Sequence, residues 1–483
     1  MKNAFSFFRT RCRWLCAVIL ALVIGFMFAA CDSPVTSQPE TDKPSVSLPS
    51  GTLPSIRLSI AANVNPWYGD PGRPNELHRT NWRSTTVSLS GGDDSYAGFA
   101  FGPVNATARG RGNSSWWMHE KRPLRFRFAT PQPMFGSSYA ATDWSLISNA
   151  MDYTLMRNYA AYLLGSLLSG LDFSPAHHMV HLYLNNEYRG VYMLTDQIHR
   201  HNGRIELINP IPSAPERSEF LLEWCGRVPE ENVGSSQYAY FTIHMGEGEW
   251  ARDVPFGISF PGSGVLRGNH GFRNFAADFV GQVNDALVRR DFNEISRLID
   301  LDSFIDFYLV QELFQNMDVG FSSVFFQIRQ INGSPRLFAG PLWDFDLSSG
   351  SAIGHYSDSQ PPRSGDCLPI HYPTARWSNP WFGHLMATPQ FRNMVVQRWN
   401  TIRNREVRTM TMIIRRMAIR YRACFDRNFE RWDQKLGNYT WRNSIEVVNI
   451  PASRGHMGQV DFFLDWLDQR KVLLTNVLLP REW

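Results

Sequence analysis

A glycine-rich, basic segment in the first third of the sequence could bind an anion. RGRGNSS occupies residues 109–115, and KRPLRFR follows at residues 121–127. The glycines free the backbone to approach a ligand, short polar side chains can donate hydrogen bonds, and Arg125 and Arg127 alternate on one face of a predicted strand. The spacing differs from that of a P-loop, and the composition is also typical of a solvated hairpin. A phosphate cradle and an ordinary turn both stay open at this point.

An aspartate stands where a long apolar helix is predicted to end. The sequence QNMD ends at Asp318, and Gly320 permits a turn before a predicted strand at residues 324–329. A carboxylate at such a helix-to-strand turn can accept a proton from an attacking hydroxyl. An acid at this end opposes the helix dipole, and a conflict with local preference is typical of functional sites. The alternative is an ordinary turn residue.

A third segment, GPLWDFDLSSG at residues 340–350, contains two closely spaced acids. Asp344 and Asp346 would point the same way if the segment were a strand. Two carboxylates on one side are what a divalent cation shared with phosphate oxygens requires. Aspartates near a turn can also simply cap backbone amides.

The elements that must position these segments are strands in the first half of the chain and helices in the second. Alternating or β-branched runs predict an antiparallel sheet, and asparagine turns predict two hairpins, one within residues 181–194 and one at Asn332-Gly333. Strands are predicted at residues 55–63, 85–90, 104–109, 124–128, 219–224, 239–244 and 324–329, and helices at 152–168, 271–289, 303–315, 390–429 and 460–477. The fold class is α+β, with a mostly antiparallel β N-terminal part and a helical C-terminal part.

Length and composition favour a large folded domain. The chain has 483 residues, of which 43% are hydrophobic and 19% are charged, so it can bury a sizeable core. Four of its 48 basic residues lie in the first thirty residues, which contain no acid, so the remaining 44 balance the 44 acidic residues. This balance gives no support for nucleic-acid binding.

The N-terminus resembles a lipoprotein signal peptide. Four basic residues precede an apolar run, Trp14 to Ala30, that is short for a membrane span, and Ala29-Ala30-Cys31 resembles a lipidation site at Cys31. We therefore expect a signal peptide at residues 1–30, followed at residues 31–53 by the lipidated cysteine and a flexible Pro/Ser-rich tether. The alternative is a retained anchor helix. Either would place an extracytoplasmic domain at a membrane of the cell envelope, with inner and outer membrane both open.

The domain expected after the tether covers residues 54–483. Its β-rich lobe is predicted at about residues 54–265 and its helical lobe at about 266–483. Beyond the tether the chain contains Cys225, Cys367 and Cys424, which allow one disulfide at most and match no zinc motif. Buried or unpaired thiols are the favoured interpretation.

Taken in order, the three segments with candidate site residues resemble the spore-coat protein H (CotH) kinase family. Members of this family look like remote relatives of protein kinases. The resemblance begins at RGRGNSSWWMHEKRPLRFRF (109–128) and continues through WSLISNAMD (144–152) and Met156-Arg157-Asn158. It then includes the hairpin YLNNEYRGVYMLTDQI (183–198) and ends with NMD and GPLWDFDLSSG. Each motif is weak alone, but the ordered set is specific, and it covers half of the chain.

The resemblance implies a role for each matching residue. Asp318 matches the catalytic-loop aspartate, and Asp344 matches the metal-loop aspartate, with Asp346 its close neighbour. The basic, glycine-rich segment would face the phosphates of ATP through Arg111, Ser114, Ser115, Lys121 and Arg127. The cofactors implied are ATP and Mg²⁺ or Mn²⁺, and the implied reaction is phosphoryl transfer to Ser or Thr of an envelope or surface protein.

Two departures from the family pattern keep a second hypothesis open. Ser322 and Ser323 stand where the family usually has a metal-binding Asn, so a second metal site is in doubt. The hairpin carries Asp196 where the family has Glu, and Glu223 could take its place. The alternative to a kinase is a non-catalytic pseudokinase scaffold or adhesion lipoprotein.

Overall fold

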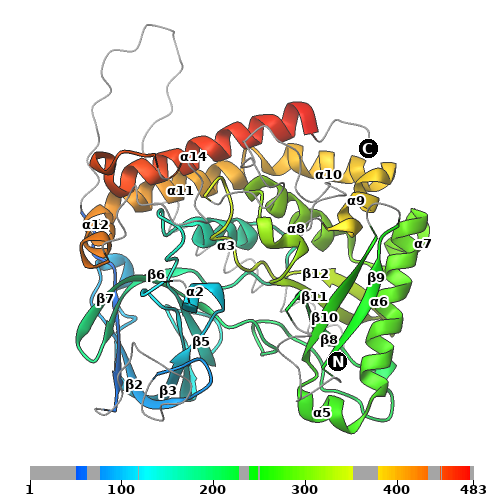
Figure 1. Ribbon diagram of the computed structural model, residues 1–483, viewed down its shortest axis with the longest axis horizontal. Coiled ribbons are helices and arrows are strands. Elements are labelled where there is room, and N and C mark those ends of the chain that lie inside the picture. The colour runs from blue at the N-terminus through cyan, green and yellow to red at the C-terminus, as the bar shows by residue number, and fades with distance from the viewer. Residues whose placement is uncertain are drawn as a thin grey trace, which may run out of the picture. The chain divides into compact units, whose positions relative to one another are not determined.

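The first seven strands of the described chain form a closed barrel (Figure 1). The computed structural model describes residues 50–61, 77–117, 119–227, 239–247, 251–351, 379–432, 447 and 449–478. Around the barrel the strands are β1 (Ser55–Ile60), β2 (Arg83–Ser90), β3 (Phe101–Gly110), β4 (Leu124–Gln132), β5 (Ala141–Ile147), β7 (Glu187–Asp196) and β6 (His178–Leu184). Neighbouring strands are antiparallel except β1 and β6, whose parallel pairing closes the barrel.

Alternation of apolar and polar residues decides which side chains enter the barrel. On β4, Leu124, Phe126 and Phe128 are buried in the barrel core with Trp144 and Tyr192. Successive side chains of a strand point to opposite faces, so the two arginines between them project outward. The strand that follows the glycine-rich segment thus packs the barrel with one face and presents positive charge with the other.

A second, five-stranded antiparallel sheet lies beside the barrel in the fold. Its order is β12 (Ser334–Ala339), β11 (Val324–Ile331), β8 (Phe220–Trp224), β10 (Arg252–Phe260) and β9 (Tyr240–Met245). Helix α6 (Gly271–Arg289) packs on β9, and α7 (Phe292–Leu298) packs on β12. The hairpin β11–β12 comes from the second half of the chain but pairs with β8 from the first half, so the sheet joins the two parts.

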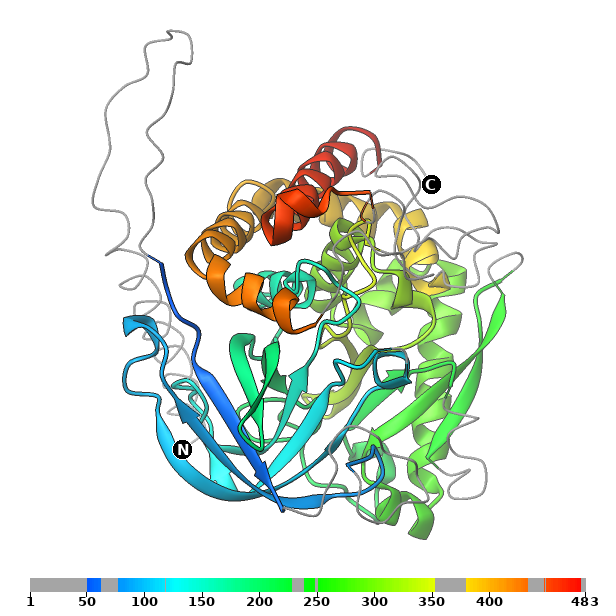
Figure 2. The same cartoon turned by 60° about the vertical axis from the view of Figure 1, so that its left-hand side comes forward.

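Helices fill the remaining side of the molecule (Figures 1 and 2). They are α3 (Arg157–Leu167), α8 (Leu301–Phe314), α9 (Pro380–Ala387), α10 (Pro389–Ile402), α11 (Glu406–Arg420), α12 (Arg422–Arg431) and α14 (Gly455–Leu473). Helix α8 is buried on nearly every side because α3, α10, α14 and β12 all contact it. It begins at the capping residue Asp300, whose side chain accepts from the Ser303 amide at 2.9 Å, and ends at Gln315, whose φ is 48°.

The predicted α+β class and mostly antiparallel β part are confirmed, as are both asparagine hairpins. Positive φ angles at Asn185 and Asn186 (48° and 67°), and at Asn332 and Gly333 (52° and 81°), are those of tight hairpin turns. The helix predicted at residues 271–289 matches α6.

One predicted helix is wrong. The single helix expected at residues 390–429 is broken into α10, α11 and α12, since the backbone leaves the helical conformation at Arg405 and changes direction at Tyr421. These breaks let the apolar stripe of each helix face one common core. The segment with Asp344 and Asp346 is an irregular loop and not a strand.

Other expectations fall on residues with little or no described structure. Residues 1–49, with Cys31, and Cys367 lie outside the described ranges, whereas Cys225 and Cys424 are buried. Within the described ranges, no helix combines the length and apolar character needed to cross a membrane.

Candidate active site

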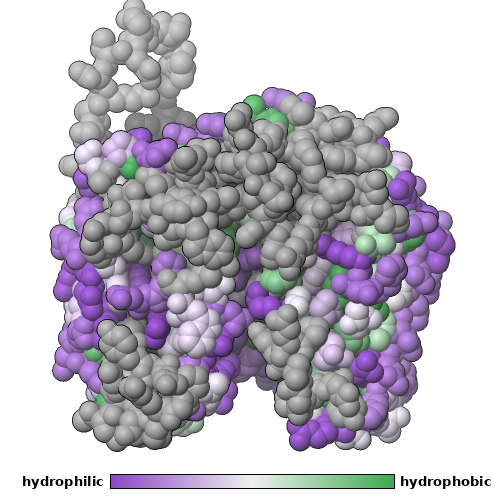
Figure 3. Space-filling model, in the orientation of Figure 1, coloured by the Kyte–Doolittle hydropathy of each residue, from purple (hydrophilic) through white to green (hydrophobic). Residues whose placement is uncertain are grey.

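One pocket, of about 920 Å³, collects most of the predicted site residues. The barrel contributes the glycine-rich loop to its wall, and the second sheet contributes Glu223 and Phe325. Figure 3 shows the face of the molecule hollowed between these two parts. Six predicted residues line the pocket: Arg111, Ser114, Ser115, Asp318, Asp344 and Asp346.

The glycine-rich loop closes one end of the pocket because its glycines allow close contacts. A Cβ on Gly110 would lie 2.2 Å from the ring of buried Trp116, and Gly112 has a φ of 83°, which side chains disfavour. The Gly112 carbonyl accepts from Arg79 Nη1 at 2.9 Å. The loop is therefore held in one shape, with Ser114 and Ser115 starting the short helix α2 (Ser114–Trp117).

The two metal-loop aspartates lie in an irregular loop that directs both of them into the pocket. Asp344 has a φ of 66°, an uncommon conformation for a residue with a side chain, and such conformations cluster at functional sites. The Phe345 amide next to it donates to Asn158 Oδ1 at 2.6 Å. A backbone conformation held by its surroundings, rather than strand alternation, brings the two carboxylates to the same place.

The carboxylates of the pocket repel one another. Burial, and then the nearby charges of Asp344 and Asp318, raise the pKa of Asp346 well above its usual value. Arg111, partly buried with its guanidinium 5.4 Å from the centre of the Trp343 ring, supplies positive charge: burial lowers its pKa and Asp344 acts against that shift. The site thus brings several acids together, and a bound cation would reduce the repulsion between their carboxylates.

A divalent cation fits these residues. Mg²⁺ is usually held by one or two protein carboxylates, with phosphate and water completing its coordination. Asp344 and Asp346 could provide such a pair, although no group of three or more His, Cys, Asp or Glu in the described part of the chain is arranged to hold a metal. When bound there, the implied metal would share these two carboxylates with phosphate oxygens and water.

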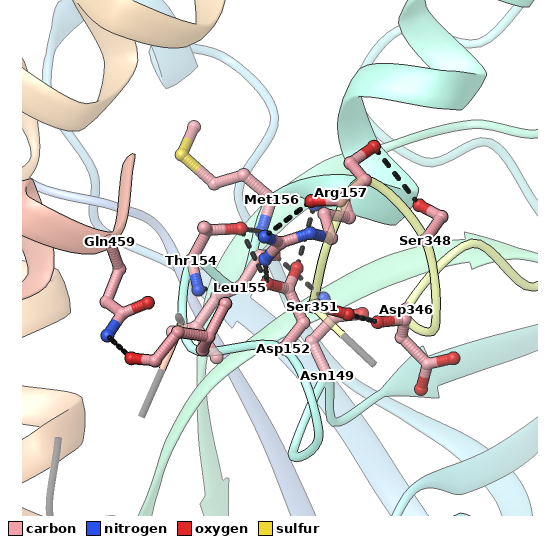
Figure 4. A network of polar contacts seen from close by, with 12 residues as sticks. Asn149, Asp152, Thr154, Leu155, Met156, Arg157, Asp346, Ser348, Ser351 and Gln459 are labelled. Carbon is pink, nitrogen blue, oxygen red and sulfur yellow. Dashed lines mark hydrogen bonds and ion pairs between the residues drawn. The ribbon is translucent and has the colours of Figure 1, made fainter. Parts of the chain in front are cut away.

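A network beneath the metal loop explains the motif at residues 152–158 (Figure 4). Asp152 and Arg157 form a fully buried ion pair, and Arg157 Nη2 donates to the Ser349 carbonyl at 3.2 Å. Ser351 Oγ donates to the Asp346 carbonyl at 2.8 Å, while the Asp346 carboxylate points away from the network. These residues support the loop, a role that sequence reasoning had not assigned to them.

Asp318 lies in a short 3₁₀ turn, Met317–Gly320, directly after α8. The Asn316 side chain accepts from the Asp318 amide at 3.2 Å and fixes the turn. Ser323, in the position where a metal-binding Asn was expected, has a φ of 63° and donates to Asp344 Oδ2 at 3.1 Å. Its hydroxyl therefore orients a carboxylate of the metal loop.

Lys121 and Arg127 do not line this pocket. Lys121 is buried, its Nζ lies 5.1 Å from the centre of the Tyr192 ring, and no described residue accepts a hydrogen bond from it. Burial lowers its pKa well below the usual value, against the attraction of Asp152. Arg127 pairs with Asp143. Their roles toward a nucleotide stay predictions.

Other residues also line the pocket wall. Glu223, suggested as a substitute for Asp196, lines the pocket, whereas Asp196 is buried and bound to Arg204 and Tyr139. Arg79, Arg109, Arg125 and Arg227 also line it. The alternation of Arg125 on its strand was visible in the sequence, but Arg79 and Arg227 lie outside every motif and reach the site only through the fold.

The sequence matches the model of a protein family described as CotH kinase protein, over residues 108–208 and 267–454. These segments make up more than half of the 483 residues, so the chain belongs to the CotH kinase protein family, as its motifs predicted. The comparison with curated proteins found no match. Membership suggests kinase activity and, with it, the use of ATP.

Proposed function

We propose that this protein is a Ser/Thr protein kinase of the CotH type, with an atypical kinase-like fold, that uses ATP and Mg²⁺ or Mn²⁺. The observation that carries the proposal is a single pocket lined by Asp318, by the metal-loop aspartates and by the glycine-rich loop. In phosphoryl transfer the protein mainly holds and orients charged groups. The residues that line this pocket are of the types that this reaction requires.

In this proposal the glycine-rich loop holds the donor. Arg111, Ser114 and Ser115 donate hydrogen bonds to phosphate oxygens, and the left-handed Gly112 lets the backbone approach them. Asp344 and Asp346 hold the cation, which neutralises phosphate charge when bound.

Asp318 acts on the acceptor. Its carboxylate orients the Ser or Thr hydroxyl and accepts its proton as the hydroxyl oxygen bonds to the γ-phosphorus of ATP. The bond from that phosphorus to the bridging oxygen of ADP breaks, so phosphoprotein and ADP are the products.

Substitution of the two kinds of aspartate tests the proposal. Asp318→Asn should lower phosphate transfer by about 10²–10⁴-fold, the usual contribution of a general base, and leave ATP binding intact. The assay is incorporation of radiolabelled phosphate into a Ser/Thr-rich protein, beside a thermal-shift measurement with ATP and metal. Asp253→Asn, at an exposed acid outside the pocket, is the control. Equal labelling by wild type and Asp318→Asn would exclude the assignment.

One observation favours the alternative, a non-catalytic scaffold. Ser323 is bonded to Asp344 and replaces a metal-binding Asn, so the site offers fewer metal ligands than the family pattern. Absence of labelling with several donors and metals, together with a retained thermal shift, would select the scaffold.

We also propose that a lipid on Cys31 holds the kinase at the membrane of the cell envelope, where its substrate would be an envelope or surface protein. The support is the basic start, the apolar run and the Ala29-Ala30-Cys31 junction. Cys31→Ser should release the protein from the membrane fraction or leave it unprocessed. Maturation and partitioning like those of the wild type would refute the lipid anchor.

A further inference from the structure

Three arginines gather around one tryptophan on the outer face of the barrel. The guanidinium groups of Arg109, Arg125 and Arg127 lie 4.8, 5.6 and 4.8 Å from the centre of the Trp82 ring. Arg109 and Arg125 are register partners on β3 and β4, and Arg127 follows two residues along β4 on the same face. We call these four residues the arginine face.

Positive charge exceeds negative charge on the arginine face. Asp143 accepts from Arg125 Nη2 at 2.6 Å and from Arg127 Nε at 3.0 Å, so one carboxylate serves two arginines. Arg109 donates to the Arg79 carbonyl, and no described residue accepts from its buried Nε. Burial, and then the charges of Arg125 and Arg127, lower the pKa of Arg109, so the neighbouring arginines disfavour its positive charge. An anionic ligand would relieve this repulsion.

The arginine face leads out of the active-site pocket. Arg109 and Arg125 line the pocket wall, while the Arg127 side chain lies outside the pocket and is 48% exposed. A ligand bound along this face would enter the pocket at one end and stay in solvent at the other. An extended peptide that places its acceptor residue in the pocket fits such a surface better than a compact nucleotide does.

We propose that the arginine face docks the acceptor protein through acidic residues next to the phosphorylated Ser or Thr. Residues two apart on a strand are separated by roughly 6.6 Å, the spacing of alternate residues in an extended peptide, so Arg125 and Arg127 match acids two positions apart. The flat guanidinium groups can bind carboxylates through paired hydrogen bonds. That the docked protein accepts phosphate rests on the proposed function, but its docking can be measured without phosphate transfer.

The experiment uses the purified full-length protein and three fluorescein-labelled peptides that differ only in the residues flanking one Ser: Glu, Gln or Arg. Fluorescence anisotropy without ATP should show the Glu peptide binding about tenfold more tightly than the Gln peptide. The preference should weaken as salt rises, since charges on exposed groups are screened within about 10 Å at 0.1 M ionic strength. Equal affinities for the Glu and Gln peptides, or a preference for the Arg peptide, would overturn the proposal.

Arg127→Gln is the test variant, and Arg415→Gln is its matched control. Both arginines are half exposed, at 48% and 49%, and each pairs with one aspartate, at 3.0 and 3.1 Å. Arg127→Gln should remove most of the preference for the Glu peptide, and Arg415→Gln should keep all of it. In the test variant Arg125 still pairs with Asp143, so an unchanged melting temperature is expected and is measured alongside.

Three further readouts separate the possible outcomes. If Arg127→Gln abolishes the ATP thermal shift while the peptide preference persists, the arginines hold the donor and the proposal is wrong. If the wild type binds vesicles that contain anionic lipid but binds no peptide, and Arg127→Gln abolishes the vesicle binding, the arginine face binds a membrane and the proposal is wrong. Binding of the Glu peptide that depends on Arg127, with no phosphate transfer, would uphold the docking face and refute the kinase assignment.

Discussion

Acids occur in two opposite electrostatic surroundings in this protein. Outside the pocket lining, Asp152 is paired with Arg157 and Glu312 with Arg470, and all four side chains are fully buried. In the pocket, Asp344 and Asp346 lie beside each other and near Asp318, and burial, followed by the charges of Asp344 and Asp318, raises the pKa of Asp346. A paired buried acid becomes costly when its partner is removed, whereas clustered acids cost stability until a ligand neutralises them. The contrast separates structural charges from functional ones.

The largest effect should come from breaking a structural pair. Burial raises the pKa of Glu312 to about 8, and the charge of Arg470 acts against this rise. Arg470→Met removes that charge and leaves Glu312 buried without a partner. Loss of one partner of a buried pair costs about 3–5 kcal/mol of the free energy of unfolding. Urea denaturation measures it, and the double variant Glu312→Leu/Arg470→Met should recover most of the loss. If Arg470→Met is as stable as the wild type, the distinction between paired structural acids and clustered functional acids is wrong.

A middle-sized effect is expected on ligand binding. ATP and Mg²⁺ at about 100 times the dissociation constant should stabilise the wild type by about 2.7 kcal/mol. Asp344→Asn should lose most of this gain because phosphate charge would then face the pocket with one carboxylate fewer to hold the cation. Thermal shifts with and without nucleotide and metal measure the difference, and an undiminished gain would show that Asp344 does not hold the cation.

The smallest effect should have the opposite sign. Asp346→Asn replaces a carboxyl group whose ionised form is disfavoured by burial and by the charges of Asp344 and Asp318, so the protein without ligands should become more stable by about 1 kcal/mol. Denaturation in a chelating buffer checks this. A loss of stability would mean that Asp346 is a structural acid like Asp152.

Much of the fold was predictable because local patterns and turn residues agree with it. The alternation on β4, the asparagine turns and the amphipathic α6 are each determined by residues close together in the sequence. Strand β5 was not predicted, since nearly all of its residues are buried and alternation disappears, nor was β10, whose Pro255 and Gly257 are unusual in a strand.

The family and the side chains at the centre of the candidate site could be recognised from the amino-acid sequence alone. Asp318, the two metal-loop aspartates and the glycine-rich loop lie in recognisable motifs, because phosphate chemistry restricts which residue types can serve. Each motif alone left an ordinary structural reading open, and the order of the motifs, which resembles that of the family, assigned the residues their roles.

How these motifs meet, and which other residues join them, depends on the three-dimensional fold. Asp344 and Asp346 face one pocket because Asn158 and the network below it hold an irregular loop, not because a strand alternates. Lys121 packs under Tyr192, and Arg127 turns outward to Trp82, although both lie in the same basic segment as Arg125. Barrel closure and core packing set the direction of each side chain, and these depend on contacts between residues far apart in the sequence.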